Sequence, residues 1–124
     1  GIGLKESGYI HLRQIGAGPA LGFWQMEPNT HDDMWRNFIA YRPELKAALM
    51  SILSGAAPHA QRLIDNPLYA GAMCRVHLFR QAASLPAAND AAGWAAYWKN
   101  HYTTAAGAGV ADQATPIFRA AMEA

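Results

Sequence analysis

Glu6 is the residue whose surroundings best suit it to acid–base chemistry. Residues 1–7 can form the last turns of a helix, and Gly8 can supply the left-handed conformation that ends it. The negative end of the helix dipole and nearby apolar side chains would both disfavour the charged carboxylate and raise its pKa. A carboxylic acid that keeps its proton near neutral pH can donate it to the leaving oxygen of a glycosidic bond. The alternative is a solvated glutamate near a helix end, the common situation for acidic residues.

A second polar segment, Gly22-Phe23-Trp24-Gln25-Met26-Glu27-Pro28-Asn29-Thr30, follows a loop over residues 15–21. The glycines of this loop allow the backbone to turn back past Glu6. The side-chain amide of Gln25 is neutral, so it can bind sugar hydroxyl or N-acetyl groups without lowering the pKa of Glu6. A local backbone bond in a tight turn is another role for Gln25, and the two roles are compatible with each other. Thr30 can hold a water molecule or cap the following helix, and we favour the cap.

These two segments resemble motifs of the lysozyme/lytic transglycosylase superfamily, in which Glu-Ser is followed at a similar separation by a Gly-Leu-Met-Gln-x-x-Pro-like segment. The string from Gly3 to Gly16, together with Gly22 to Gln25, resembles phage proteins of that type more closely. The resemblance covers the chain up to about Trp35. It implies that Glu6 is the catalytic acid of a muramidase, which cleaves the β-1,4 bond between N-acetylmuramic acid and N-acetylglucosamine. It also implies that Ser7, Tyr9 and Gln25 orient this acid or the substrate.

Glu27, Asp32 and Asp33 are the candidates for a second carboxylate. An inverting glycosidase needs one to activate water, at roughly 6.5–9.5 Å from the acid. Lytic transglycosylases do without it, because the sugar's own C6 hydroxyl attacks and leaves a 1,6-anhydro product. Glu27 stands where the transglycosylase motif has an apolar residue, and this departure leaves the type of product open. We expect Asp33 to cap a helix.

A second concentration of aromatic residues lies between Trp94 and Thr103. Many lysozyme-like domains place a Tyr-Asn pair on a late helix above the catalytic glutamate, and the resemblance suggests Asn100 and Tyr102 as counterparts, with a looser order and spacing. The predicted lining of the cleft is Trp24, Tyr97, Asn100 and Tyr102, with Glu27 and Thr30 as further substrate-binding candidates. For Tyr97, Asn100 and Tyr102 a purely structural role is equally compatible. Trp94 and Trp98 lie four residues apart, share a helix face and are predicted to face the core.

The composition argues against nucleic-acid binding, membrane spanning and metal binding. A chain of 124 residues with a formal net charge of +1 is long enough for one domain and carries no strong overall charge. The arginines are scattered, so no nucleic-acid patch is expected, and no apolar run reaches the ~20 residues of a membrane span. Cys74 is the only cysteine and reads as a small apolar filler in a helix. The histidines show neither an i,i+4 pair nor a short cluster, so neither a metal nor another cofactor is expected.

Helix signals dominate along the chain. Residues 9–14 alternate weakly and are the candidate for a short strand. A capping-box variant at Thr30 predicts a helix to about Tyr41, and Pro43 opens the next helix, which Gly55 closes. Further helices are predicted at 59–64, from Pro67 to about Ala83, from Asp90 towards His101, and from Thr115-Pro116 to about Met122, with a small-residue turn at 105–109. On the Pro67 helix one apolar face is expected, made of Leu68, Ala72, Val76, Phe79 and Ala83.

The sequence therefore predicts a mainly α fold, a lysozyme-like helical domain over residues 1–124 with at most a very small β element. A helix ending near Ser7 is too short to be stable alone, so we expect native sequence before Gly1 or packing to hold it. The resemblance implies a monomeric muramidase whose partners are peptidoglycan glycan strands. It would be made in the cytoplasm of a bacterial host and act on the cell wall in the periplasm, as a phage endolysin or a virion-associated enzyme. The alternatives are a non-catalytic lysozyme-like module for glycan binding or phage assembly, and a chitinase-like hydrolase.

Overall fold

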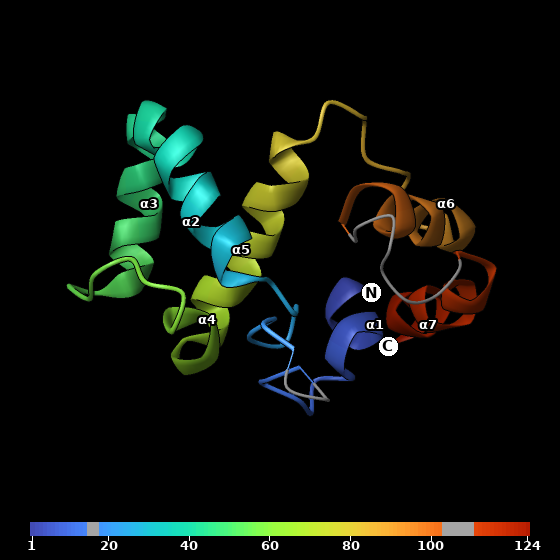
Figure 1. Cartoon of the computed structure of the whole chain (residues 1–124). Helices are drawn as coiled ribbons and strands as arrows, with labels where there is room; N and C mark the ends of the chain where they lie inside the picture. Colours follow the sequence, from blue (N-terminus) through green and yellow to red (C-terminus); the bar gives the residue numbers. More distant parts are fainter. Residues whose placement is uncertain (15–17, 103–110) are drawn as a thin grey trace.

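The computed structural model describes residues 1–14, 18–102 and 111–124, and within these ranges the chain is mainly helical, as predicted (Figure 1). The elements are α1 (Ile2–Ser7), α2 (Pro28–Asn37), the 3-10 helix η1 (Ile39–Tyr41), α3 (Pro43–Leu53), α4 (Arg62–Asp65), α5 (Pro67–Arg80), α6 (Ala91–Tyr97), the π-helical turn η2 (Trp98–Tyr102) and α7 (Ala111–Glu123). None of the helices in these ranges is long and apolar enough to cross a lipid bilayer.

The β structure of the described residues consists of two isolated bridges, Arg13 with Leu21 and Leu21 with Met26. The short strand predicted over residues 9–14 is wrong. Tyr9 has a φ of 57°, in the left-handed region, so the chain turns directly after α1 instead of extending. The two bridges hold the loop that follows α1 against the segment that leads into α2.

Helix α5 joins two hydrophobic clusters. The first cluster gathers side chains from α2, η1, α3 and α4 around Tyr69, Met73 and Val76 of α5. The second gathers side chains from α1, α6, η2 and α7 around Cys74 and Leu78. Figure 1 shows α5 between the group of α2, α3 and α4 and the group of α1, α6 and α7. The indole of Trp24 packs against both clusters, so the loop before α2 is fixed where the two groups meet.

The start of α5 confirms the prediction, whereas its buried face does not. Asn66 caps the helix by accepting a hydrogen bond from the backbone N–H of Tyr69, and Pro67 occupies the first turn. The helix ends at Arg80, earlier than predicted. Leu68 and Phe79 are 70 % and 56 % exposed, so the predicted apolar face is wrong. The helix contributes to clusters on two sides, and its buried residues therefore come from two faces.

The other helices show which local sequence signals determine where a helix begins. Helix α2 begins at Pro28 with Glu27 at the N-cap position, three residues before the cap predicted at Thr30, because proline favours the first helical turn. Asp33 does not cap this helix. In α7, Pro116 lies inside the helix instead of opening it. Asp90 caps α6 as predicted, by accepting from the backbone N–H of Gly93. The turn predicted at 105–109 lies outside the described residues.

Candidate active site

Glu6 lies one residue before the end of α1. The helix ends as the sequence predicts, because Gly8 adopts φ 60° and its N–H donates to the carbonyl of Leu4 at 3.0 Å. Ile2 is buried in the second cluster, and α1 packs against α7. Packing therefore holds this short helix and fixes the position of the Glu6 carboxylate.

The carboxylate of Glu6 receives a hydrogen bond from Trp98. The indole Nε1 donates to Oε1 at 2.5 Å, and Trp98 is only 2 % exposed. Burial raises the pKa of Glu6 above its ordinary value, while the Trp98 bond and the nearby Lys5 ammonium act in the opposite direction. The ammonium of Lys5 lies 4.6 Å from the centroid of the Trp98 ring. The result is a half-buried acid with a raised pKa.

Sequence reasoning placed Trp98 in the core and missed its contact with Glu6. The ring of Trp98 does pack in the second cluster, and its indole N–H also reaches the carboxylate of Glu6. A buried indole N–H needs an acceptor. The prediction of a partly buried Glu6 could have supplied that acceptor, although nothing in the sequence indicated which tryptophan would reach it.

Ser7 ties the end of α1 to the following aromatic segment. Its hydroxyl lies within hydrogen-bond distance of the carbonyls of Phe23, at 2.7 Å, and Gly3, at 3.2 Å, and it accepts from the N–H of Tyr9 at 3.1 Å. The rings of Tyr9, Phe23 and Trp24 then pack edge to face, with centroids 5.7–6.4 Å apart. Tyr9 remains 46 % exposed. Ser7 therefore positions an aromatic surface next to the helix end that carries Glu6.

Gln25 makes the local backbone bond that was expected in a tight turn. It has a φ of 51°, and its side-chain nitrogen donates to the carbonyl of Gly22 at 2.9 Å. Glu27 is exposed at the N-cap of α2 and makes no side-chain capping bond. Thr30 lies in the first turns of α2, where it lines a pocket.

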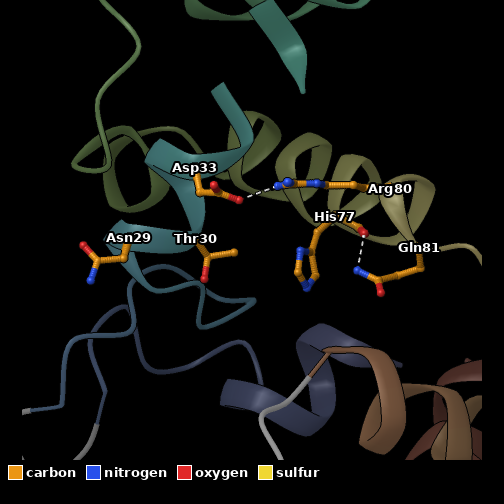
Figure 2. A pocket seen from close by; sticks show the side chains of 6 residues that line it. All are labelled: Asn29, Thr30, Asp33, His77, Arg80 and Gln81. Atoms are coloured by element: carbon orange, nitrogen blue, oxygen red, sulfur yellow. Dashed lines mark hydrogen bonds and ion pairs between the residues drawn. The ribbon is translucent and has the colours of Figure 1, made fainter. Parts of the chain in front are cut away.

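This pocket lies between α2 and the C-terminal half of α5, and its volume is about 470 Å³. It is lined by Asn29, Thr30, Asp33, His77, Arg80 and Gln81 (Figure 2). Nη1 of Arg80 donates to Oδ2 of Asp33 at 2.5 Å. Bonds from Asn37 and Arg80 hold the pKa of Asp33 below its ordinary value. The sequence analysis assigned no role to the polar residues at 77, 80 and 81, although their spacing places them on one side of a helix end.

Tyr102 contacts the segment before α2 and the imidazole of His77. Its hydroxyl donates to the carbonyl of Trp24 at 2.5 Å, and its ring centroid lies 5.2 Å from that of His77. Burial raises the pKa of Tyr102 well above its ordinary value, and electrostatic interactions with Cys74 and Glu6 act in the same direction.

Tyr97 and Asn100 were also predicted to line the cleft. Tyr97 is buried, and its hydroxyl donates towards the carbonyl of Ala83 at 3.3 Å, so this side chain packs in the core. Asn100 is exposed on η2. Trp94 is only half-buried, and its indole donates to the carbonyl of Ala87 at 3.0 Å. The structure thus brings Trp98 into contact with Glu6, while Tyr102 contacts Trp24 and His77.

Chemically, this arrangement can donate a proton from a fixed, partly desolvated carboxylic acid beside aromatic and polar side chains. Among the described residues, no group of three or more His, Cys, Asp or Glu side chains could hold a metal ion. No protein-family model, curated protein or solved structure matches this chain.

Proposed function

We propose that this chain is a glycosidase that cleaves peptidoglycan, with Glu6 as its general acid. The observation that carries the proposal is the carboxyl group of Glu6, whose pKa is raised by burial and whose Oε1 accepts from Trp98. In a protonated carboxyl group the carbonyl oxygen is the better acceptor, so the bond to Oε1 leaves the acidic proton on Oε2. A positioned proton of this kind is what departure of a glycosidic oxygen requires.

The surroundings of Glu6 support a sugar substrate. The edge-to-face cluster of Tyr9, Phe23 and Trp24 offers aromatic surface next to the acid. The resemblance of Glu6-Ser7 and the segment from Gly22 to Pro28 to muramidase motifs favours peptidoglycan over chitin. Action on the bacterial cell wall after synthesis in the cytoplasm belongs to the same proposal.

The candidates for a second carboxylate favour a reaction that does not need one. Asp33 is bound to Arg80 and Asn37, and Asp32 lies 2.9 Å from Nδ1 of His31. Glu27 is exposed at the start of α2. We therefore infer that the C6 hydroxyl of the muramic acid attacks C1 while the proton of Glu6 passes to the leaving oxygen. The resulting Glu6 carboxylate accepts the hydroxyl proton, and a 1,6-anhydro end is formed.

Digestion of purified peptidoglycan, with mass spectrometry of the sugar ends, tests the proposal. Glu6→Gln keeps the shape of the side chain and removes the transferable proton, so the rate should fall by about 10²–10⁴-fold. Glu27→Gln is the matched control and should retain substantial activity, as should Asp32→Asn and Asp33→Asn. Circular dichroism verifies that each variant is folded.

Each contrary result points to a different function. Full activity of a folded Glu6→Gln variant would refute the acid assignment. Cleavage of chitin without cleavage of peptidoglycan would favour the chitinase-like hydrolase, and glycan binding without cleavage would favour the non-catalytic module. Reducing ends, together with loss of activity in one of the three control variants, would support a two-carboxylate mechanism.

A further inference from the structure

An exposed arginine, Arg42, lies over two phenylalanine rings on the surface of the molecule. Its guanidinium carbon is 4.3 Å from the ring centroid of Phe38 and 5.4 Å from that of Phe79. The two rings pack edge to face, with their centroids 6.1 Å apart. Phe38 ends α2, Arg42 joins η1 to α3, and Phe79 lies in α5. We call these three residues the arginine–phenylalanine cluster.

The charge of Arg42 is available to a partner. The residue is exposed, and its side chain forms no ion pair with any other described residue. Arg80 also lies beside Phe38, with its guanidinium carbon 5.8 Å from the ring centroid, but its charge is compensated by Asp33 (Figure 2). Arg42 is therefore the cation of this cluster that can bind an anion from solution.

Further positive charges lie on the same segments. Arg36, Lys46 and Arg75 are exposed, lie within four positions of a cluster residue, and take part in none of the ion pairs of the described residues. Glu44 is the only acidic residue within the same limits of the sequence. The surroundings of Arg42 therefore attract a negatively charged partner.

The geometry of the cluster indicates which anion fits. The N–H donors of a guanidinium lie in its plane and form a fork that matches a carboxylate. The rings of Phe38 and Phe79 hold this fork in place, so less rotational freedom is lost when it binds. Phe79 is 56 % exposed and offers apolar surface beside the guanidinium. The cluster suits a carboxylate that is followed by an apolar side chain.

We propose that the arginine–phenylalanine cluster docks an acidic peptide segment of another protein. A Glu or Asp carboxylate of this segment binds the guanidinium of Arg42, and a neighbouring apolar side chain packs on the ring of Phe79. The proposal is independent of the glycosidase function, because the cluster does not include Glu6 or any residue in contact with it.

Two other classes of anionic partner fit the cluster less well. Nucleic-acid bases stack on the open faces of aromatic rings, but Arg42 lies over both rings of the cluster. A protein that binds a bilayer surface inserts its apolar side chains into the lipid. The ring of Phe79 instead packs against Phe38 and Arg42. A peptide needs neither an open ring face nor a protruding side chain.

Nuclear magnetic resonance of the isotopically labelled full chain tests the proposal with defined probes. The peptide acetyl-Glu-Leu-Glu-amide should saturably shift the Nε–H signal of Arg42 and the ring signals of Phe79. Acetyl-Gln-Leu-Gln-amide, which lacks the charge, should bind about tenfold more weakly. Acetyl-Glu-Gly-Glu-amide, which lacks the apolar side chain, should also bind more weakly.

Three results of these titrations would overturn the proposal. The first is failure of the acidic peptide to bind, and the second is equal binding of the uncharged peptide. The third is binding of oligothymidylate, or of phosphatidylglycerol vesicles, without binding of the acidic peptide. In that case the cluster would serve a nucleic acid or a membrane surface.

Substitutions of Arg42 separate the guanidinium fork from charge alone. Arg42→Gln should weaken binding of the leucine peptide by about tenfold or more. Arg42→Lys keeps the charge but not the planar fork, and it should give an intermediate loss. Arg119→Gln removes the same charge from an exposed residue of α7 and should leave the affinity unchanged. Unchanged affinity in a folded Arg42→Gln variant would show that the peptide binds elsewhere.

Phe79→Ala provides a second test that does not alter Arg42. It should reduce the affinity for the leucine peptide towards that for the glycine peptide, and the glycine peptide itself should bind as before. Circular dichroism verifies that each variant is folded. Full affinity of Phe79→Ala for the leucine peptide would refute the apolar contact that the proposal requires.

Discussion

The indole nitrogen of Trp98 donates a hydrogen bond of 2.5 Å to Oε1 of Glu6, and this bond joins residues that are 92 positions apart in the sequence. It connects the end of α1 with η2. It also favours the ionised carboxylate, whereas burial disfavours it. The proton affinity of Glu6 therefore depends on a contact between two segments that lie far apart in the sequence.

Trp98→Phe should raise the pKa of Glu6 further, because the substitution keeps an aromatic ring and removes the N–H donor. The alkaline limb of the pH–rate profile for peptidoglycan cleavage should move to higher pH. Carbon NMR titration of the Glu6 carboxyl group gives the same quantity without substrate. Trp94→Phe is the control, because its indole donates to Ala87 and its loss should not move the limb. An unchanged or downward-shifted Glu6 pKa in Trp98→Phe would contradict the assigned bond.

Glu6→Gln should stabilise the fold at neutral pH. The folded-state pKa of Glu6 is raised, so the stabilising contribution of the protonated form is complete below the unfolded pKa and is lost as pH rises through the folded pKa. A glutamine cannot ionise, and its oxygen can still accept from Trp98. Thermal unfolding should give a higher Tm for the variant than for the native protein at pH 7. The difference should shrink below the ordinary glutamate pKa of 4.5. A variant that is less stable at both pH values would disprove this account.

Tyr69→Phe should destabilise the first cluster through two lost hydrogen bonds. The hydroxyl of Tyr69 accepts from Nε1 of Trp35 at 2.8 Å and lies 2.6 Å from Nε2 of the buried His31. Each buried group left unpaired costs about 1–3 kcal/mol. Urea denaturation should show this loss in the free energy of unfolding. Tyr41→Phe, at a residue that is 78 % exposed, should change it by less than about 0.5 kcal/mol. Equal effects of the two substitutions would mean that the hydroxyl of Tyr69 contributes nothing.

Gly22→Ala should be more destabilising than Gly55→Ala. Both glycines have positive φ, 75° and 91°, so both substitutions introduce backbone strain. A Cβ at Gly22 would also overlap the backbone carbonyl of Leu63, whereas one at Gly55 would meet no atom within 4 Å. Thermal or urea unfolding of the pair isolates the cost of the overlap, which should exceed 1 kcal/mol if it resembles overpacking in a core, about 1–3 kcal/mol. Similar losses of stability would mean that the loop moves away from α4 at little cost.

Several elements were predictable because a few neighbouring residues decide them. Gly8 ends α1, Asn66 and Pro67 begin α5, and Asp90 caps α6. In each case the deciding chemistry is a left-handed backbone, a fixed φ or a side-chain cap, all of which act within one helical turn. The prediction of a strand at 9–14 was wrong, because it relied on a weak alternation of apolar residues and could not anticipate the left-handed φ of Tyr9.

By itself, the sequence determined that the chain is mainly helical, where most helices begin and that Glu6 stands at the end of one, since these features depend on local backbone preferences. Only the tertiary structure decided that α5 buries two faces, because helices pack on both of its sides. It also decided that Trp98 reaches Glu6 and that His77 lines a pocket with residues of α2. These contacts join segments far apart in the chain, and their geometry depends on how whole helices pack against one another.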